Sequence, residues 1–99
     1  LRIAVDTYYN AAELVVKAFL IADGRPLPRT HGGYIHAFAE AYARAGRAPE
    51  DLVADLHRGL ELGSKARYDP DYSPSPSDCS ALASLYEELR RLAAKALEL

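Results

Sequence analysis

Apolar residues recur with a helical period over most of the chain, and the pattern predicts four helices. The first covers residues 1–22, where polar side chains return every three or four positions and most others are apolar or aromatic. Its polar positions are Arg2, Asp6, Asn10, Glu13 and Lys17. At roughly 100° per residue they form a stripe about 80° wide. We therefore expect this helix to lie centrally or at an interface with another chain.

Two more helices are predicted between glycine and proline residues. The helix over 31–45 follows Thr30, a good N-cap residue, and ends before Gly46. The helix over 49–66 begins with Pro49, because proline is favoured at the first helical position. Both helices carry an apolar face, so each is expected to pack against its neighbours.

The fourth helix, over 76–97, has the clearest start. Ser75 is of a residue type favoured at the N-cap, Pro76 takes the first position, and Asp78 stands where a capping box needs an acidic side chain. No segment has the alternation of a strand. The fold class is therefore all-α. Because short loops favour antiparallel neighbours, we expect an antiparallel, up-and-down bundle of about four helices in one domain, 1–99.

The third helix and the linker after it have distinctive residues. Gly59 and Gly63 lie four positions apart near the apolar face, where the absence of side chains permits close approach of another helix. Prolines at positions 70, 74 and 76 make the linker that follows stiff and extended. If the chain has a chemical site, we expect it from Gly63 to Tyr72.

Composition narrows the classes of function. The 99 residues are 49% hydrophobic with a net charge of −2, which disfavours a protein that binds nucleic acid mainly by covering phosphates. A small local cationic site is compatible with this balance. No apolar run approaches the roughly 18 residues of a membrane span, and the single Cys79 cannot form an internal disulfide. We expect a cytoplasmic protein without membrane contact, metal site or cofactor.

Three segments form a recognisable series. They read YYNAAELVVKAFL, THGGYIHAF and LHRGLELGSKARYDPDY. In this order and spacing they resemble the HEPN domain family of bacteria and archaea. The resemblance implies a helical bundle that dimerises. Many members of that family are metal-independent endoribonucleases that act as toxins beside a nucleotidyltransferase antitoxin, whereas others bind nucleotides or are non-catalytic partners.

The resemblance also implies site residues. Ribonuclease members of the family carry an arginine followed a few residues later by a histidine, at the end of a helix. Here Gly63 stands at the arginine place and Tyr68 at the histidine place, as in the branch of the family that has tyrosine there. Arg67 falls on the same helical side as Gly63 and reaches a phosphate if the helix continues that far. Since glycine cannot stabilise the charge that develops on phosphorus, the resemblance implies an impaired endoribonuclease.

The segment from Gly63 to Tyr72 is also the predicted binding site for a nucleotide or RNA. The candidate binding residues are Lys65, Arg67, Asp69 and Tyr72, with Tyr68 available to donate a hydrogen bond or to stack on a base. The simpler alternative is that the two cations only complement the negative end of a helix dipole.

Supporting residues are predicted at Asn10, Glu13 and His31. Asn10 and Glu13 either frame the site, or Glu13 makes an ordinary helix ion pair with Lys17. His31 is either a displaced general base or a structural histidine that forms a hydrogen bond near the start of its helix.

The chain begins at Leu1 rather than methionine. Members of the family have a further helix ahead of the segment that matches Tyr8 and Tyr9, so we expect a truncated start. Without that helix, the apolar sides of the 1–22 helix would be covered by a partner chain, and a homodimer is the expected assembly.

Two functions follow from these observations. One is an endoribonuclease of the toxin type, impaired at Gly63. The other is a non-catalytic module that binds a nucleotide or a partner such as a nucleotidyltransferase. A structural dimer without a ligand is a third alternative.

Overall fold

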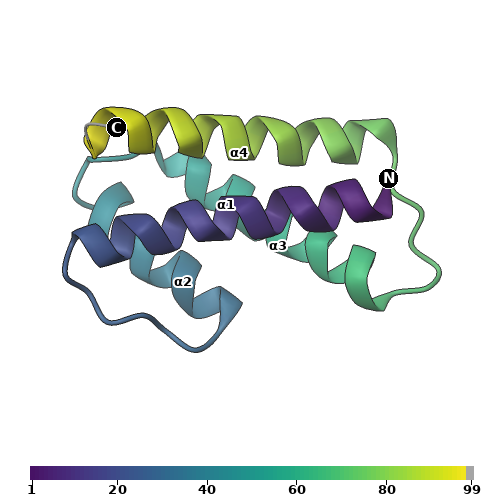
Figure 1. Ribbon diagram of the computed structural model, residues 1–99, viewed down its shortest axis with the longest axis horizontal. Helices are drawn as coiled ribbons and strands as arrows, with labels where there is room; N and C mark the ends of the chain where they lie inside the picture. Colours follow the sequence, from purple (N-terminus) through teal and green to yellow (C-terminus); the bar gives the residue numbers. More distant parts are fainter. Residues whose placement is uncertain (98–99) are drawn as a thin grey trace.

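The computed structural model describes residues 1–97, and its elements are helical throughout this range (Figure 1). The elements are α1 (Arg2–Ala22), α2 (His31–Phe38), a π-helical turn η1 (Ala39–Ala43), α3 (Glu50–Tyr68) and α4 (Pro76–Ala96). The predicted all-α bundle of four helices is confirmed. Residues 98–99, at the end of the predicted domain, lie outside the described part of the chain.

Capping side chains set two of the helix starts as the sequence predicts. The Thr30 hydroxyl accepts a hydrogen bond from the Gly33 amide at 2.9 Å. Ser75 and Asp78 form the capping box, each side chain accepting from the other residue's amide. Pro49, in contrast, precedes the first residue of α3 instead of occupying its first position.

Helix α3 is also longer than predicted, because it continues to Tyr68 and not only to residue 66. The Asp69 amide still donates to the Lys65 carbonyl at 3.0 Å, in the α-helical pattern. Arg67 therefore belongs to the helix. The prediction that Arg67 reaches the site depended on this.

The segment predicted as a helix over 31–45 is α-helical to Phe38 and continues as a π-helical turn to Ala43. After Phe38 the chain widens into η1, where the Arg44 amide donates to the carbonyl of Ala39, five residues earlier, at 2.9 Å. The wider turn brings Tyr42 into the core, where its ring stacks on Phe38 with centroids 5.3 Å apart and meets Phe19 edge-on at 4.8 Å. The Tyr42 hydroxyl donates to the Phe19 carbonyl at 2.9 Å. These contacts account for the departure from α-helical geometry.

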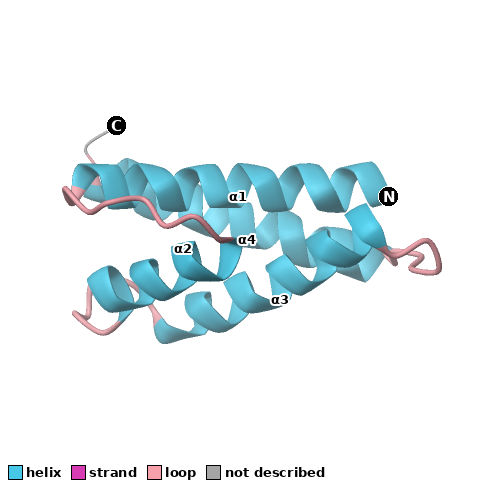
Figure 2. Ribbon diagram, turned by 90° about the horizontal axis from the view of Figure 1, so that it is seen from below, coloured by secondary structure: helices cyan, strands magenta, loops and turns pink. Residues whose placement is uncertain are grey.

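The helix directions differ from a strict up-and-down order. Helices α1 and α2 are parallel, because His31 at the start of α2 contacts Glu13, and Tyr42 farther along contacts Phe19. The reason is the segment 23–30, which runs back along α1 before α2 begins (Figures 1 and 2). Its prolines keep it extended, so it is not the tight turn that antiparallel helices need.

Helices α3 and α4 both pack beside α1 and run in opposite directions to each other (Figure 1). In α3, Gly63 lies against Tyr9 and Arg67 against Asp6, so the order along the chain is reversed and α3 is antiparallel to α1. Helix α4 runs in the direction of α1, as Figure 1 shows, and Tyr86 faces Tyr8 with ring centroids 6.3 Å apart.

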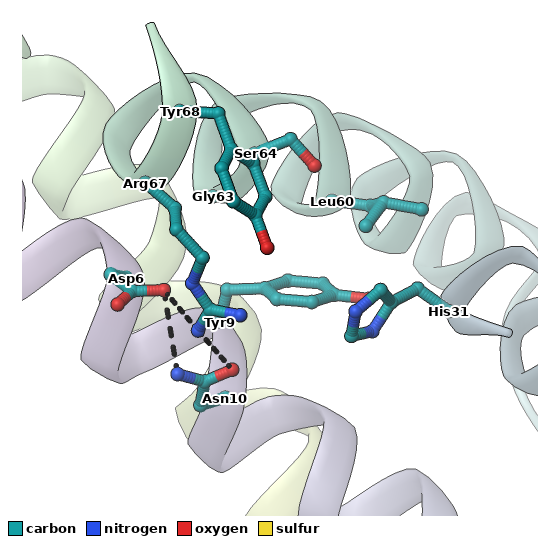
Figure 3. Close-up of a pocket in the computed structure, with 9 residues that line it drawn as sticks. All are labelled: Asp6, Tyr9, Asn10, His31, Leu60, Gly63, Ser64, Arg67 and Tyr68. Atoms are coloured by element: carbon teal, nitrogen blue, oxygen red, sulfur yellow. Dashed lines mark hydrogen bonds and ion pairs between the residues drawn. The ribbon is translucent and has the colours of Figure 1, made fainter. Parts of the chain in front are cut away.

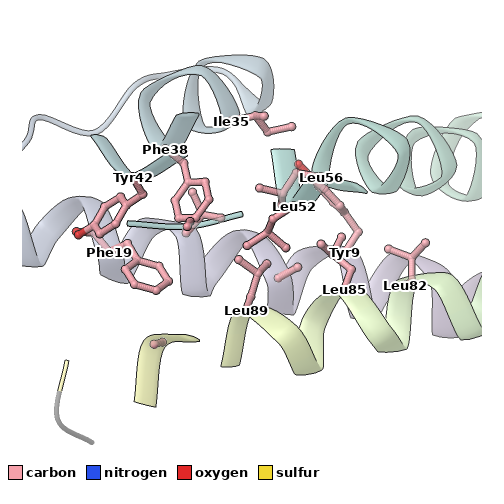
Figure 4. Packing of buried hydrophobic residues seen from close by; sticks show 14 of the residues in the cluster. Tyr9, Phe19, Ile35, Phe38, Tyr42, Leu52, Leu56, Leu82, Leu85 and Leu89 are labelled. Atoms are coloured by element: carbon pink, nitrogen blue, oxygen red, sulfur yellow. The ribbon is translucent and has the colours of Figure 1, made fainter. Parts of the chain in front are cut away.

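One continuous apolar core joins all these helices (Figure 4). Its largest fully buried side chains are Phe19, Leu20, Ile35, Phe38, Leu52, Leu56, Leu82, Leu89, Val5 and Val16. The predicted role of the two glycines is confirmed. A Cβ at Gly59 would come within 2.8 Å of Leu85, and one at Gly63 within 3.1 Å of Tyr9. Helix α3 therefore lies closer to α1 and α4 than side chains would allow.

Arg2 fixes the end of α3 against the first turn of α1. Its guanidinium donates to the carbonyls of Lys65 at 3.2 Å, Ala66 at 2.8 Å and Asp69 at 2.6 Å, and also to that of Tyr72. The carbonyls at a helix C-terminus lack helical partners and carry partial negative charge. One cation thus satisfies both the helix end and the linker beyond it.

Part of α1 keeps its apolar side chains in solvent. Ile3 is 82% exposed, and Leu14 and Ile21 are more than half exposed. The expectation that the sides of this helix are not fully covered within the chain is confirmed by these exposures. No helix among residues 1–97 is long and apolar enough to cross a membrane.

Candidate functional site

A small pocket of about 70 Å³ lies between α1 and α3, with the start of α2 at one end (Figure 3). Helix α1 contributes one wall and α3 the other, and His31 comes from α2. The lining residues are Asp6, Tyr9, Asn10, His31, Leu60, Gly63, Ser64, Arg67 and Tyr68. Five of the predicted site positions therefore meet here, namely Asn10, His31, Gly63, Arg67 and Tyr68.

Arg67 is the cation in this lining. Its Nη2 donates to Asp6 Oδ1 at 2.7 Å and to Asn10 Oδ1 at 3.2 Å. The neighbouring Tyr68 hydroxyl and the Asp6 carboxylate raise the pKa of Arg67 above its ordinary value. A guanidinium has five N–H donors, and both of these bonds leave from one nitrogen. Donors on the other two nitrogens remain for a ligand.

Gly63 is a buried packing position in this structure. A Cβ there would lie 3.1 Å from both Cβ and Cγ of Tyr9 and 3.3 Å from Cδ2. The Tyr9 Cβ is attached to the backbone of α1, so it cannot move aside without shifting the helix. A side chain at position 63, where the family resemblance predicts an arginine, would therefore press on Cβ and Cγ of Tyr9.

The Tyr9 ring runs along the pocket to a buried carboxylate. Glu13 is only 6% exposed, and its Oε2 accepts from the Tyr9 hydroxyl at 2.9 Å and bonds His31 Nδ1 at 2.6 Å. Burial, followed by the charge of Glu13, raises the pKa of Tyr9 well above its ordinary value, so this hydroxyl stays protonated.

Lys17 is a more distant partner of Glu13, with its Nζ 3.8 Å from Oε1. The predicted helix ion pair between Glu13 and Lys17 is present, but the carboxylate is buried and its shorter bonds go to Tyr9 and His31. His31 likewise bonds this carboxylate instead of a group at the start of its own helix.

Tyr68 is 75% exposed at the mouth of the pocket, and Figure 3 shows its hydroxyl directed toward the interior. Ser64 and Leu60 complete the α3 wall. Sequence reasoning missed these two. The signal was present, since Leu60, Ser64 and Tyr68 recur at the four-residue spacing that places side chains on one helix face.

Three predicted binding residues lie outside the pocket lining. Lys65 pairs with Glu61 at 3.3 Å on the outer side of α3. Asp69 accepts from the Asp71 amide at 2.9 Å through its side chain. The Tyr72 hydroxyl donates to Asp78 at 2.7 Å, and burial together with this bond raises the pKa of Tyr72 to about 12. The contacts of Asp69 and Tyr72 order the linker between α3 and α4.

Within residues 1–97, no group of three or more His, Cys, Asp or Glu side chains lies close enough together to hold a metal ion.

Comparison with known proteins gives one match. The family model of the HEPN domain matches residues 1–97, which is nearly the whole chain. Neither a curated protein nor a solved structure matches the chain significantly.

Proposed function

Because the chain belongs to the HEPN domain family, we propose that it binds a phosphate-bearing nucleotide or RNA segment in the pocket between α1 and α3. The observation that carries this proposal is Arg67, a cation with donors to spare, on the wall of a pocket that also holds Tyr68 and Ser64. A guanidinium binds phosphate through paired N–H groups. The hydroxyls of Tyr68 and Ser64 add neutral donors.

The size of the pocket limits what enters it. A space of about 70 Å³ admits a phosphate group and not a whole nucleotide. The sugar and base would lie at the mouth, where the exposed ring of Tyr68 offers a stacking surface. This arrangement favours single-stranded RNA or a free nucleotide over a paired helix.

Asp6 opposes the phosphate, because its carboxylate already neutralises part of the charge on Arg67. We therefore expect modest affinity that falls as salt rises. The net charge of −2 is consistent with a single local contact instead of a broad basic surface.

The test is to titrate a fluorescent single-stranded RNA oligonucleotide, and separately ATP, into Arg67→Ala, Lys65→Ala and Arg58→Ala. Arg67→Ala should weaken binding by about 10- to 100-fold, since a charged hydrogen bond contributes about 1.5–3 kcal/mol. Lys65 and Arg58 both pair with Glu61 away from the pocket, so their variants should bind as the parent does. Equal loss in all three variants would contradict the proposal and point to non-specific charge.

A second role rests on a different observation, the exposed apolar side chains of α1. We propose that Ile3, Leu14 and Ile21 are covered by a second copy of the chain. Leu14→Lys should convert a dimer to a monomer in light scattering, whereas Ala54→Lys on the exposed side of α3 should not. A parent chain that is monomeric at high concentration would exclude the homodimer. The surface would then suit a nucleotidyltransferase, which co-expression and joint purification can detect.

A further inference from the structure

We propose that His31, oriented by the buried carboxylate of Glu13, accepts a proton in the pocket and cleaves bound RNA without a metal. This inference rests on the proposed function, because it takes the pocket of Arg67 as the place where the RNA phosphate binds. It differs from the family pattern in one respect. The reactive base would come from the start of α2, and not from the end of α3.

The bonds around Glu13 determine which nitrogen of His31 is available. A carboxylate only accepts hydrogen bonds, so the 2.6 Å contact to Glu13 Oε2 places a hydrogen on Nδ1. In the neutral ring the lone pair is then on Nε2. The second bond to Oε2, from the Tyr9 hydroxyl at 2.9 Å, holds the carboxylate in position. A buried carboxylate behind a histidine is how proteins orient imidazole as a base.

The exposure of the two residues fits this division of roles. Glu13 is 6% exposed, whereas about half of the surface of the His31 side chain is exposed. His31 also lines the pocket, which Glu13 does not. Burying a carboxylate is unfavourable unless it is paired and hydrogen-bonded. A residue that served packing alone at position 13 would need no charge.

Helix α3, which forms the other wall of the pocket, supplies the remaining groups that RNA cleavage requires. Figure 3 shows His31 and Arg67 at opposite ends of the Tyr9 ring, with the hydroxyls of Ser64 and Tyr68 on the α3 side. A phosphate between them meets a base, a cation and a hydroxyl donor. Those are the three functions that metal-free phosphoryl transfer needs.

The reaction is an internal transphosphorylation that consumes no co-reactant. Nε2 of His31 takes the proton of the ribose 2′-hydroxyl, and the 2′ oxygen forms a bond to phosphorus. The bond from phosphorus to the 5′ oxygen breaks with its electron pair on oxygen, which takes a proton from the Tyr68 hydroxyl. Arg67 balances the charge on the phosphoryl oxygens. Solvent then removes the proton from His31 and returns one to Tyr68, leaving a 2′,3′-cyclic phosphate and a 5′-hydroxyl.

The experiment follows an end-labelled single-stranded RNA in the presence of EDTA, beside the same oligonucleotide made of DNA. The parent chain should produce 2′,3′-cyclic phosphate ends from RNA and leave DNA intact. His31→Ala should slow cleavage about 10²–10⁴-fold without changing RNA affinity, and added imidazole should restore part of the rate. His36→Ala is the matched control, because His36 is exposed on the same helix and pairs with Glu40; its rate should equal that of the parent.

Glu13 is tested as a positioning residue through Glu13→Gln. The amide oxygen can still accept from Nδ1, but the charge is gone, so the maximal rate should fall while KM stays unchanged. A thermal melt checks that this buried variant folds, and the exposed His31→Ala keeps the inference testable if it does not.

RNA that binds through Arg67 but stays intact would overturn this inference and leave the proposed function standing. Cleavage that His31→Ala does not slow would also overturn it. Absence of binding that depends on Arg67 would overturn both.

Discussion

Gly63 of α3 packs directly against Tyr9 of α1. A Cβ at position 63 would lie 3.1 Å from both Cβ and Cγ of Tyr9. Glycine at this position is thus part of the contact between the two helices that form the pocket. The same residue stands where the family resemblance places an arginine. In this chain Arg67, one helical turn later, provides the cation in the pocket instead.

Introducing the arginine should therefore destabilise the fold. We expect Gly63→Arg to lower the free energy of unfolding by about 1–3 kcal/mol, because overpacking forces α1 and α3 apart. Ser64→Arg, at the next and exposed position, should change it by less than about 0.5 kcal/mol. Urea denaturation of both variants measures the difference. A Gly63→Arg chain as stable as the parent would mean that α1 can shift to accommodate a side chain.

Removing the Arg2 guanidinium should loosen the end of α3. Arg2→Ala leaves the carbonyls of Ala66 and Asp69 without their charged donor, and we expect a loss of about 1–3 kcal/mol. Hydrogen exchange at the Tyr72 amide should accelerate, because the linker loses its tie to α1. Arg25→Ala, which removes an exposed pair with Asp23, is the control and should leave exchange there unchanged.

The hydroxyl of Tyr42 should contribute modestly to stability. Tyr42→Phe removes its bond to the Phe19 carbonyl, but that carbonyl also accepts from the Asp23 amide at 3.0 Å. Since no buried acceptor is left unsatisfied, we expect a loss of about 0.5–1.5 kcal/mol in chemical denaturation. Tyr34→Phe, at a half-buried position outside η1, serves for comparison. A loss several times larger for Tyr42→Phe would show that the hydroxyl maintains the π-helical turn itself.

Acid should weaken the start of α4 through one carboxylate. The Tyr72 hydroxyl and the amide of Ser75 lower the pKa of Asp78 below its ordinary value. A lowered pKa in the folded state gives stability that is present above the unfolded value, about pH 4, and is lost as pH falls through the folded value. Tyr72→Phe should therefore lose less stability than the parent between about pH 6 and about pH 3. Equal acid sensitivity in the two proteins would contradict this assignment, since the similarly paired Asp23 and Glu87 are present in both.

Local signals in the sequence predicted most of the fold. The four helical segments follow from periodicity, and the caps at Thr30 and Ser75 follow from residue type. The π-helical turn could not be predicted, because it goes with the packing of Tyr42 against Phe19 of α1, a contact that is distant in sequence. The parallel course of α2 was missed for a similar reason. Short-loop rules favour antiparallel neighbours, whereas segment 23–30 is extended.

The site was predicted in part. Periodicity and the family resemblance together indicated the end of α3, and Arg67 and Tyr68 do line a pocket there. The bond between His31 and Glu13 could not be read from their spacing of 18 residues, since it exists only because α2 begins beside the middle of α1. Lys65, Asp69 and Tyr72 were grouped with the site by sequence proximity, which ignores the direction in which a helix presents each side chain.

The course of segment 23–30 has one more consequence. The bundle core is specified by residues inside the helices, and this connection returns along α1 to the start of α2, where His31 lies beside the pocket (Figure 2). Insertions or deletions in such an exposed connection alter the core little. Because His31 belongs to the same short helix as the buried Ile35 and Phe38, a change of length that the connection absorbs should leave His31 at the edge of the pocket.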